Sequence, residues 1–374
     1  MKFLIIRFSS IGDIVLTTPA IRCLKQQLPD AELHFLSRGI FKDVTLHNPY
    51  IDRRFYYDNN LGELIGQLKE EQYDYVIDFQ KNVRSYKIRA ALKTKTLSFK
   101  KLRVQKFFLT KLGVDIMPGR HITQRCLDTL LPLGVADDGY GLDYFLDKKD
   151  RVQESDLPAS HRDGYVAVVI GASYFTKKMP VIKLQQLCLL IDRPVVLIGG
   201  GEDVREGEAI AAADPEKIVN VCGRFSLNGS ADLIRQSELV ISHDTGMQYI
   251  ACAFGKQVLA IWGGTSPLLD VEPYYGERRW AGGGAERRSG PGLRRPGPGA
   301  MHGVNGLGPD VEHPAPYTNF VVPGLRCQPC SSFGKKKCPA GHFSCMHSHD
   351  VQAIAAEAMA RLALIRSSAH RSCS

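Results

Sequence analysis

Two separate series of short apolar runs, each alternating with stretches of helical periodicity, constrain the fold of this 374-residue chain more than any other feature. Runs that are apolar throughout are typical of strands buried on both faces, and their alternation with helices indicates parallel sheets. A chain of this length exceeds one ordinary core, so two domains are expected. The sequence therefore predicts an α/β protein with two doubly wound parallel sheets.

The two series give the boundaries of the predicted elements. Strands of the first series are expected at 3–8, 32–36, 53–57, 75–79 and 96–99, with helices at 13–28, 61–71 and 102–112. Strands of the second are expected at 165–170, 195–198, 218–221, 239–242 and 258–262, with helices at 181–191, 206–213 and 230–236. The predicted domains are 1–150 and 164–275, joined by a polar linker at 151–163 that contains Pro158.

The character of the chain changes after residue 275. Residues 276–316 are dominated by Gly, Pro and Arg without periodicity, which predicts a disordered segment; a segment foreign to the fold is the alternative. Residues 317–374 form a further part that contains several cysteines and an amphipathic helix at 351–365. Five other cysteines lie in apolar periodic segments and are expected to be small core residues: Cys23, Cys126, Cys188, Cys222 and Cys252.

Composition limits the class of protein. A hydrophobic share of 44% with 23% charged residues is typical of a soluble globular protein, and no apolar run reaches the ~20 residues that span a bilayer. Arg7, Asp13 and Arg22 interrupt the first apolar segments, so these do not form a secretory signal. We expect a cytoplasmic protein.

The net charge of +9 is concentrated in one basic run. Residues 81–111 contain eleven Lys or Arg residues and no Asp or Glu. A solvated helix face is one interpretation, but such faces normally mix signs, so an anionic partner is favoured. No nucleic-acid module is recognisable, which leaves a phosphorylated substrate or an anionic membrane surface. The candidate contacts are Lys81, Arg84, Lys87, Arg89, Lys100, Lys101 and Arg103.

Two strand-turn-helix units carry carboxylates at the start of their helices. Asp244, Thr245 and Gly246 follow a buried strand, and Asp13 follows the first strand of the chain. Unpaired N–H groups at a helix start favour a phosphate, although Asp and Thr are also ordinary helix caps. Both units would lie at the carboxyl edge of a parallel sheet, where ligands bind.

The motifs of these turns resemble those of one enzyme family. They are Ser9-Ser-Ile-Gly-Asp-Ile-Val-Leu-Thr-Thr-Pro19 and His243-Asp-Thr-Gly-Met-Gln-Tyr-Ile-Ala-Cys-Ala-Phe-Gly255. Further matches are Gly171-Ala-Ser-Tyr-Phe-Thr-Lys-Lys-Met-Pro180, Gly263-Gly-Thr-Ser-Pro267 and the cysteine motif from Cys327 to Met346. Together they resemble glycosyltransferase family 9, the heptosyltransferases of lipopolysaccharide assembly, over nearly the whole chain except 276–316.

The resemblance implies a GT-B fold, with two Rossmann-like domains facing a central cleft. It places the acceptor on the N-terminal domain and the nucleotide-sugar donor on the C-terminal domain, and in such folds the last helix often crosses back. The implied reaction moves a heptose or a related sugar from an ADP-activated donor to a lipopolysaccharide core acceptor, with inversion and without a metal or other cofactor. It also implies that the protein is cytoplasmic and acts at the inner face of the inner membrane.

The resemblance also implies roles for individual residues. Asp13 would be the general base that deprotonates the acceptor hydroxyl, with a helix cap as the alternative interpretation. Lys177 would stabilise the leaving diphosphate, with Lys178 as the adjacent alternative. The implied donor contacts are Ser10, Gly12, Lys178, Glu202, Asp244, Thr245, Gly246 and Tyr249. Among them, Asp244 would hold sugar hydroxyls and Glu202 the ribose.

Three features depart from the family pattern. Tyr249 stands where His is common, Met179 stands where Trp is usual, and the segment 276–316 interrupts the chain beside the donor domain. A binding protein that keeps the fold but no longer turns over is therefore the second functional hypothesis.

The C-terminal cysteines offer a possible metal site. Cys327, Cys330, Cys338 and Cys345, with His342 nearby, supply enough ligands for tetrahedral zinc. The second pair lacks the close C-x2-C spacing of zinc ribbons, so reduced packing cysteines or redox-sensitive thiols are favoured over zinc.

Overall fold

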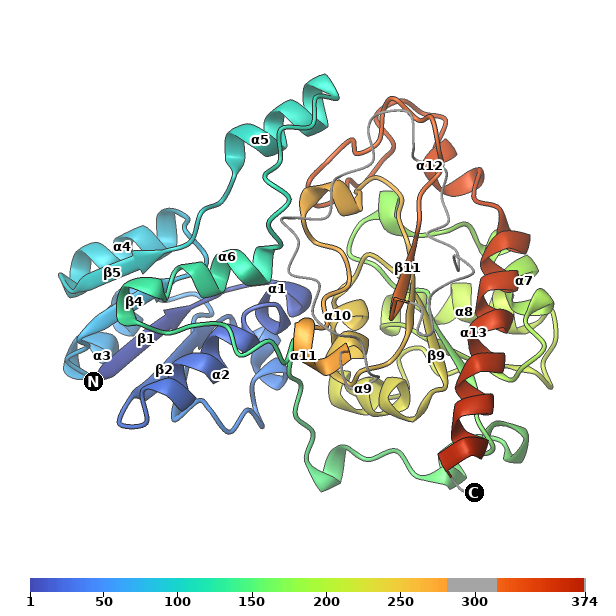
Figure 1. Ribbon diagram of the computed structural model, residues 1–374, viewed down its shortest axis with the longest axis horizontal. Helices are drawn as coiled ribbons and strands as arrows, with labels where there is room; N and C mark the ends of the chain where they lie inside the picture. The colour runs from blue at the N-terminus through green and yellow to red at the C-terminus, as the bar shows by residue number, and fades with distance from the viewer. Residues whose placement is uncertain (281–314, 373–374) are drawn as a thin grey trace.

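The computed structural model describes residues 1–280 and 315–372, which form two parallel sheets side by side, each flanked by helices (Figure 1). The first sheet has the strand order β3-β2-β1-β4-β5 and the second the order β11-β10-β9-β6-β7-β8. All pairings within both sheets are parallel. The expected fold class is confirmed.

The strands agree closely with the sequence-based prediction. In the first sheet they are β1 (Lys2–Ile6), β2 (Glu32–Ser37), β3 (Arg53–Tyr56), β4 (Tyr75–Asp78) and β5 (Lys95–Ser98). In the second they are β6 (Val166–Val169), β7 (Val195–Ile198), β8 (Ile218–Asn220), β9 (Leu239–His243), β10 (Val258–Ile261) and β11 (Tyr317–Phe320). β11 was not predicted; it pairs with β10 after the chain returns from residues 281–314.

The helices differ more from the prediction. Those of the first part are α1 (Ile11–Val15), α2 (Thr18–Gln27), α3 (Leu61–Glu70), α4 (Val83–Leu92), α5 (Arg103–Phe107) with the π-helical turn η2 (Phe108–Leu112), and α6 (Ile122–Asp128). Those of the second are α7 (Val181–Leu190), α8 (Val204–Ala211), α9 (Leu227–Gln236), α10 (Gly246–Ala253), α11 (Glu277–Trp280), α12 (Ser344–His347) and α13 (Val351–Ser372). Helices α4 and α6 were not predicted.

The predicted helix at 13–28 is divided into α1 and α2. Pro19 has no N–H, so it cannot donate to the carbonyl of Val15. The Thr18 hydroxyl donates to that carbonyl instead, at 2.7 Å, and α2 begins anew with Pro19 in its first turn. The prediction of one continuous helix was therefore wrong at its proline.

The last helix remains with the second sheet. The buried face of α13 includes Ile354, Ala358 and Leu362, which share a core cluster with Leu184 of α7. Figure 1 shows α13 running along the side of the second sheet that lies farther from the first. The expected crossing back to the N-terminal domain is not what the described residues show.

Two further predictions concern the core and the segment after 275. The five cysteines expected in the core are all buried. Most of the Gly/Pro/Arg-rich segment predicted to be disordered lies outside the described residues, and Arg278 at its start donates from its backbone N–H to the carbonyl of Gly139, at 2.8 Å. Among the helices described, none is long and apolar enough to cross a bilayer.

The two halves of the molecule meet where α1 packs against α10. A Cβ built on Gly12 would lie 2.7 Å from the ring of Tyr249 and 3.2 Å from the Cα of Gly246. A Cβ built on Gly246 would lie 2.6 Å from Ile11. Glycine at both positions is therefore what allows the two helices to approach so closely.

We expect Gly12→Ala to lower the free energy of unfolding by about 1–3 kcal/mol, because overpacking forces neighbouring groups to shift. Gly66→Ala is the matched control, since a Cβ at that α3 position has nothing within 4 Å. Alanine there should stabilise the protein by roughly 0.5–1 kcal/mol through helix propensity. Thermal unfolding of both variants checks this, and equal effects would contradict the close packing of α1 on α10.

Candidate active site

Asp13 lies at the start of α1, directly after the first strand and its turn. Both the backbone N–H and the hydroxyl of Ser10 donate to its Oδ2, at 2.9 and 3.0 Å. The other carboxylate oxygen pairs with the guanidinium of Arg7, which also donates to the carbonyl of Phe79. Asp13 thus forms a capping box with Ser10 at the start of α1, as the helix-cap interpretation predicts. The side chain remains 24% exposed, so it can also reach a ligand.

The environment keeps Asp13 ionised. Burial alone would raise the pKa of this carboxyl, but the positive charge of Arg7 and the two Ser10 hydrogen bonds hold it below its ordinary value. An ionised carboxylate is the form that can accept a proton.

Replacing Arg7 should therefore change the pH dependence of any activity that needs ionised Asp13. Arg7→Gln removes the charge that lowers the pKa of Asp13 and leaves the burial that raises it. Asp13 would then become protonated at a higher pH, so the acid limb of kcat/KM against pH moves upward. Arg7→Lys keeps the charge and should leave the limb near its wild-type place. An identical limb in both variants would contradict the coupling.

A second charged group lies at the start of α10. Lys177, at the end of the 3-10 turn η7 (Phe175–Lys177), places its Nζ 2.7 Å from Oδ2 of Asp244 and 2.9 Å from the backbone carbonyl of Asp244. The hydroxyl of Thr265, fully buried, donates to the same Oδ2 at 2.8 Å. The structure thus brings together two residues that the sequence placed 67 positions apart.

The neighbouring residues anchor this loop to the second sheet. Met179 is buried, and its N–H donates to Nε2 of His243 at 3.0 Å. Burial lowers the pKa of His243 to about 3, so the ring is neutral and its Nε2 can accept that bond. Met179 therefore contributes a buried side chain and a backbone hydrogen bond at this position.

Lys178 points away from Lys177. Its Nζ pairs with the buried carboxylate of Asp203 and lies 3.3 Å from Glu206. Burial lowers the pKa of Lys178, but the bond to Asp203 and the two negative charges raise it overall. Glu202 is exposed in the 3-10 turn η8 (Gly201–Asp203), just beyond the end of β7. Lys178 is thus bound to the turn that also carries Glu202, while Lys177 is bound to Asp244.

The small residues of the two turns contact each other. Ile11 and Gly12 fill the space beside the Cα of Gly246. A ligand therefore cannot reach the start of α10 from that side. Thr245 is the residue before the helix, and its side chain lies 3.5 Å from the hydroxyl of Ser242. The ring of Tyr249 packs on Gly12, and its hydroxyl donates to the carbonyl of Val271 at 2.6 Å. Tyr249 therefore joins the two halves of the molecule.

Part of the predicted basic run lines a pocket between α4 and α5. The pocket has a volume of about 640 Å³, and its lining includes Lys81, Arg89, Lys100, Lys101 and Arg103 together with Tyr86. Arg84 instead lies over the ring of Tyr57, and Lys87 is exposed on α4. Burial lowers the pKa of Lys101, and Asp13 is among the charges that act on it in the opposite direction. Lys81 of this pocket lies 3.5 Å from the carbonyl of Phe99, and the guanidinium of Arg7, the partner of Asp13, lies over the Phe99 ring, so the pocket adjoins the Arg7–Asp13 pair.

The segment that contains the C-terminal cysteines packs against the loop that carries Lys177. The N–H of Lys335 donates to the hydroxyl of Thr176 at 2.8 Å, and the N–H of Cys330 donates to the carbonyl of Gly264. Cys327 Sγ lies 3.7 Å from Nε2 of His342. Burial raises the pKa of the Cys345 thiol to about 12, and Cys338 lies in the same segment. The hydrogen bonds of this segment to Thr176 and Gly264 hold it next to the turn that carries Lys177.

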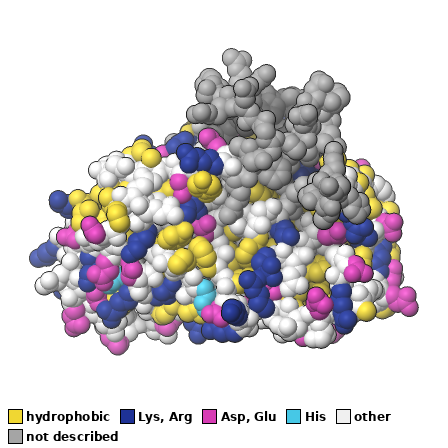
Figure 2. Space-filling model, turned by 60° about the horizontal axis from the view of Figure 1, so that its bottom comes forward, with side chains coloured by type: hydrophobic (Ala, Val, Ile, Leu, Met, Phe, Trp, Pro, Cys, Tyr) yellow, Lys and Arg dark blue, Asp and Glu magenta, His cyan; other side chains and the backbone are white. Residues whose placement is uncertain are grey.

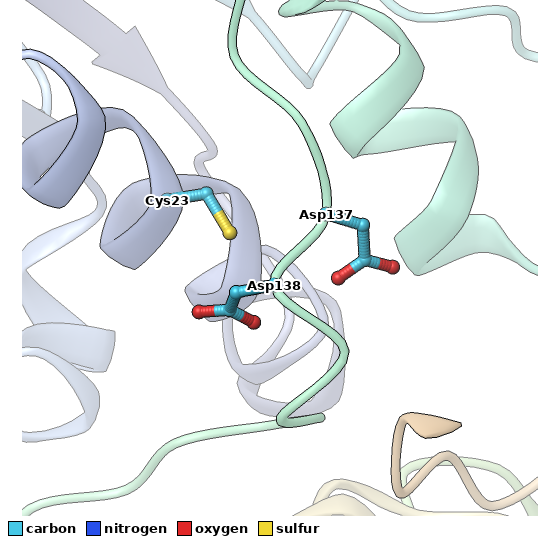
Figure 3. Close-up of side chains that lie close together, drawn as sticks. All are labelled: Cys23, Asp137 and Asp138. Carbon is cyan, nitrogen blue, oxygen red and sulfur yellow. The ribbon is translucent and has the colours of Figure 1, made fainter. Parts of the chain in front are cut away.

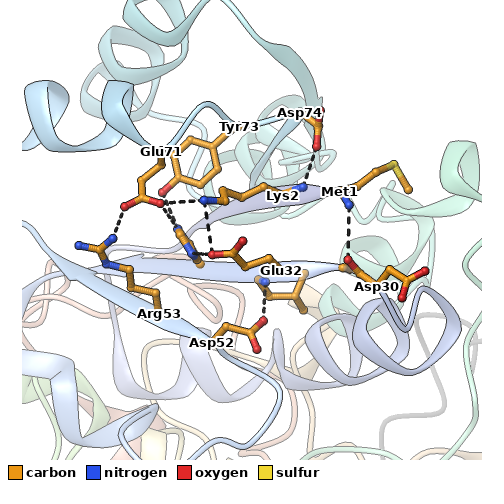
Figure 4. A network of polar contacts seen from close by, with 12 residues as sticks. Met1, Lys2, Asp30, Glu32, Asp52, Arg53, Glu71, Tyr73 and Asp74 are labelled. Atoms are coloured by element: carbon orange, nitrogen blue, oxygen red, sulfur yellow. Dashed lines mark hydrogen bonds and ion pairs between the residues drawn. The ribbon is translucent and has the colours of Figure 1, made fainter.

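Two other groups of potential metal ligands are present, both outside this segment. Among the described residues, three or more ligand atoms lie within 4.8 Å of one another at Cys23, Asp137 and Asp138 (Figure 3), and at Glu32, His34 and Glu71 (Figure 4). The four C-terminal cysteines do not form such a group in the described part of the chain.

Both groups are already neutralised by cations. Arg22 donates to both carboxylate oxygens of Asp138 at 2.7 Å. Lys2 Nζ lies 3.0 Å from Glu71 and 3.4 Å from Glu32, and the network of Figure 4 continues to Arg53. These clusters are therefore explained as ion-pair networks.

Comparison with known proteins supports one family. The family described as glycosyltransferase family 9 (heptosyltransferase) matches residues 61–282, more than half of the chain. The chain belongs to this family. Lipopolysaccharide heptosyltransferase 1 of Campylobacter coli is 22% identical to this family 9 glycosyltransferase over 71% of the chain and 84% of its own length. Its counterpart in Pseudomonas aeruginosa is 25% identical over 71% of the chain and 80% of its own length.

Solved structures show that the fold is shared. E. coli ADP-heptose heptosyltransferase II superimposes with a TM-score of 0.66 at 15% identity, covering 97% of this chain and 99% of that one. An E. coli heptosyltransferase solved with ADP-2-deoxy-2-fluoro heptose gives a TM-score of 0.57 at 20% identity, covering 71% of this chain and 90% of that one. This family 9 glycosyltransferase therefore has the GT-B fold, as the resemblance implied.

Sequence reasoning missed three residues that complete the site. Arg7 is a charge inside the first apolar run, and its position just before the turn was the available signal. Thr265 lies in Gly263-Gly-Thr-Ser-Pro267, a motif noted without a role for the threonine. Asp203 follows Glu202 but is buried and bound to Lys178. Thr265 and Asp203 contact partners that are 21 and 25 positions away, and Arg7 contacts Asp13 across the turn between β1 and α1; a linear pattern does not reveal these contacts.

Proposed function

We propose that this chain is an inverting, metal-independent glycosyltransferase that moves a heptose or related sugar from an ADP-activated donor to a lipopolysaccharide core acceptor. The observation that carries the proposal is the contact between Gly12 and Gly246. Asp13 and Thr245 are the residues next to these glycines, so the candidate base and the candidate donor turn face each other across one junction. Lys177 and Asp244 lie beside that junction.

The proposed reaction is a single displacement. The oxygen of an acceptor hydroxyl forms a bond to the anomeric carbon of the donor as the bond from that carbon to the diphosphate oxygen breaks. Asp13 accepts the hydroxyl proton, and attack from the face opposite the diphosphate inverts the anomeric centre. Lys177 and the backbone amides near Thr245 stabilise the negative charge that develops on the leaving ADP. In this scheme the cation of Lys177 takes the place that a metal ion has in other transferases.

The names of the relatives support the choice of substrates. The Campylobacter and Pseudomonas proteins are named lipopolysaccharide heptosyltransferases, and one E. coli relative was solved with an ADP-heptose analogue. On the chain itself, the Lys177–Asp244 group suits a diphosphate sugar, since it offers one cation and one acceptor of sugar hydroxyls. The basic pocket near Asp13 suits an anionic acceptor. If the acceptor is anchored in lipid, the proposed transfer takes place at the inner face of the inner membrane, and the enzyme is a peripheral protein of that membrane.

The direct experiment incubates the protein with ADP-heptose and a heptose-free core acceptor, and follows the mass of the acceptor. We expect the mass to increase by one heptose, with chelator present or absent. Omitting the acceptor controls for hydrolysis of the donor. No transfer to any core acceptor would contradict the proposal.

The second candidate is a catalytically impaired binding protein of the same fold. It is favoured by Tyr249, because its hydroxyl is bound to the carbonyl of Val271 and its ring is packed on Gly12. A donor contact at this position would have to displace that packing. Measured ADP affinity without transfer would support this candidate over the enzyme.

A further inference from the structure

One arm of the molecule, residues 102–117, projects from the N-terminal domain beyond α4 and α6 (Figure 1). It consists of α5, η2 and the chain that follows to Met117. On its inner side, Leu109 and Met117 are buried against Leu269 of the 3-10 turn η9 (Pro267–Leu269) in the other half of the molecule. Lys106 also faces inward, over the ring of Phe333 at 5.9 Å. The arm is therefore held in place by contacts with the C-terminal half.

The arm is unusually apolar for an exposed segment. Five large hydrophobic side chains remain about half exposed or more: Val104 (63%), Phe107 (55%), Leu112 (58%), Val114 (48%) and Ile116 (47%). Exposed hydrophobic residues that occur singly need no explanation, but a concentration on one projecting segment indicates a contact surface. The inward contacts of Leu109 and Met117 show that the arm has its own anchors and does not need these five for packing.

Positive charge surrounds the same segment. Arg103 and Lys111 are exposed within the arm, whereas Lys106 faces inward, and the basic pocket between α4 and α5 adjoins its base. The acidic residue of the arm, Asp115, accepts a hydrogen bond from the N–H of Met117 at 3.0 Å. The face shown in Figure 2, in contrast, has blue, magenta and yellow side chains interspersed. The arm thus combines exposed apolar side chains with an excess of one charge.

We propose that this arm docks the protein onto an anionic lipid bilayer, with its exposed apolar side chains inserted at the interface and its basic residues among the lipid headgroups. Segments of this composition bind membrane interfaces through buried apolar area together with attraction to anionic lipid. Arg103, Lys111 and the cations of the adjoining pocket favour an anionic bilayer as the occupant, because such cations are attracted to anionic headgroups. The inference rests on the proposed function in one respect: docking through the arm would bring the basic pocket and Asp13 to the surface that holds a lipid-linked acceptor.

The test is co-sedimentation of the full chain with vesicles of phosphatidylglycerol and phosphatidylcholine. Wild-type protein should bind them, bind less in high salt, and bind poorly to pure phosphatidylcholine. Phe107→Ser/Leu112→Ser should weaken binding by about tenfold or more, because two side chains lose their apolar burial. Ile182→Ser is the matched control: Ile182 on α7 is 58% exposed, as Leu112 is, and binding should stay unchanged.

Activity separates this inference from the proposed function. The Phe107→Ser/Leu112→Ser variant should transfer sugar normally to a water-soluble acceptor without acyl chains, and slowly to the same acceptor embedded in vesicles. Vesicle binding that persists in the variant, or falls equally with Ile182→Ser, would overturn docking by the arm. Vesicle binding by the wild type without transfer to either acceptor would instead overturn the proposed function and leave the docking intact.

Discussion

Asp13→Asn is expected to slow sugar transfer by about 10²–10⁴-fold, the usual contribution of a positioned general base. Asparagine has nearly the same shape, and its carbonyl can still accept from the N–H and hydroxyl of Ser10. It cannot take the acceptor proton. Steady-state kinetics should therefore show a loss in kcat, while isothermal titration with ADP shows binding close to wild type.

Stability must be measured beside activity, because Asp13 also pairs with the buried Arg7. Losing that partner costs about 1–3 kcal/mol, and unfolding curves will show whether the variant stays folded at the assay temperature. Asp147→Asn is the control: Asp147 also caps a helical turn, accepting from the N–H of Lys149, but its carboxylate lies beside His47. Transfer by a folded Asp13→Asn variant at the wild-type rate would remove Asp13 from the role of base.

Most of the central strands were predictable because they are apolar over nearly their whole length. In β7 and β10, for example, every residue is buried, so no alternation was needed to recognise them. Helix α4 was missed for the opposite reason: within a run of basic residues it buries only Ser85 and Ile88, which leaves no apolar stripe. β11 was missed because four residues with mixed burial follow a long segment without pattern.

The candidate site was predictable in its parts and not in its assembly. The turns at Asp13 and Asp244 could be found from the sequence because a helix start after a buried strand has a recognisable composition. The contact of Gly12 with Gly246 could not, since it depends on how the two halves pack. The ion pairs of Arg7 with Asp13 and of Lys177 with Asp244 are likewise tertiary contacts, and these pairs decide the charge of the site.

The ion pair of Lys177 with Asp244 leads to the second large expected effect. In the structure these groups pair with each other, and in the proposed mechanism a bound donor would draw Lys177 to its diphosphate and Asp244 to its sugar. Lys177→Met removes the cation and leaves the carboxylate near the diphosphate. We expect a 10²–10³-fold loss of kcat/KM, about the cost of one group that stabilises developing charge. Lys178→Met should cost less, because Lys178 is bound to Asp203 in the adjacent turn.

A double-mutant cycle shows whether the pair acts as a unit. If Lys177 and Asp244 are coupled, Lys177→Met with Asp244→Asn should lose less than the product of the two single losses, because the second change removes the carboxylate that the first left unpaired. Lys183→Met is the control: Lys183 on α7 also donates to a backbone carbonyl, that of His349 at 3.1 Å, and its loss should leave kcat/KM unchanged. Fully multiplicative losses would mean that the two residues act on the donor independently, and that the ion pair seen between them plays no part in how the donor is bound.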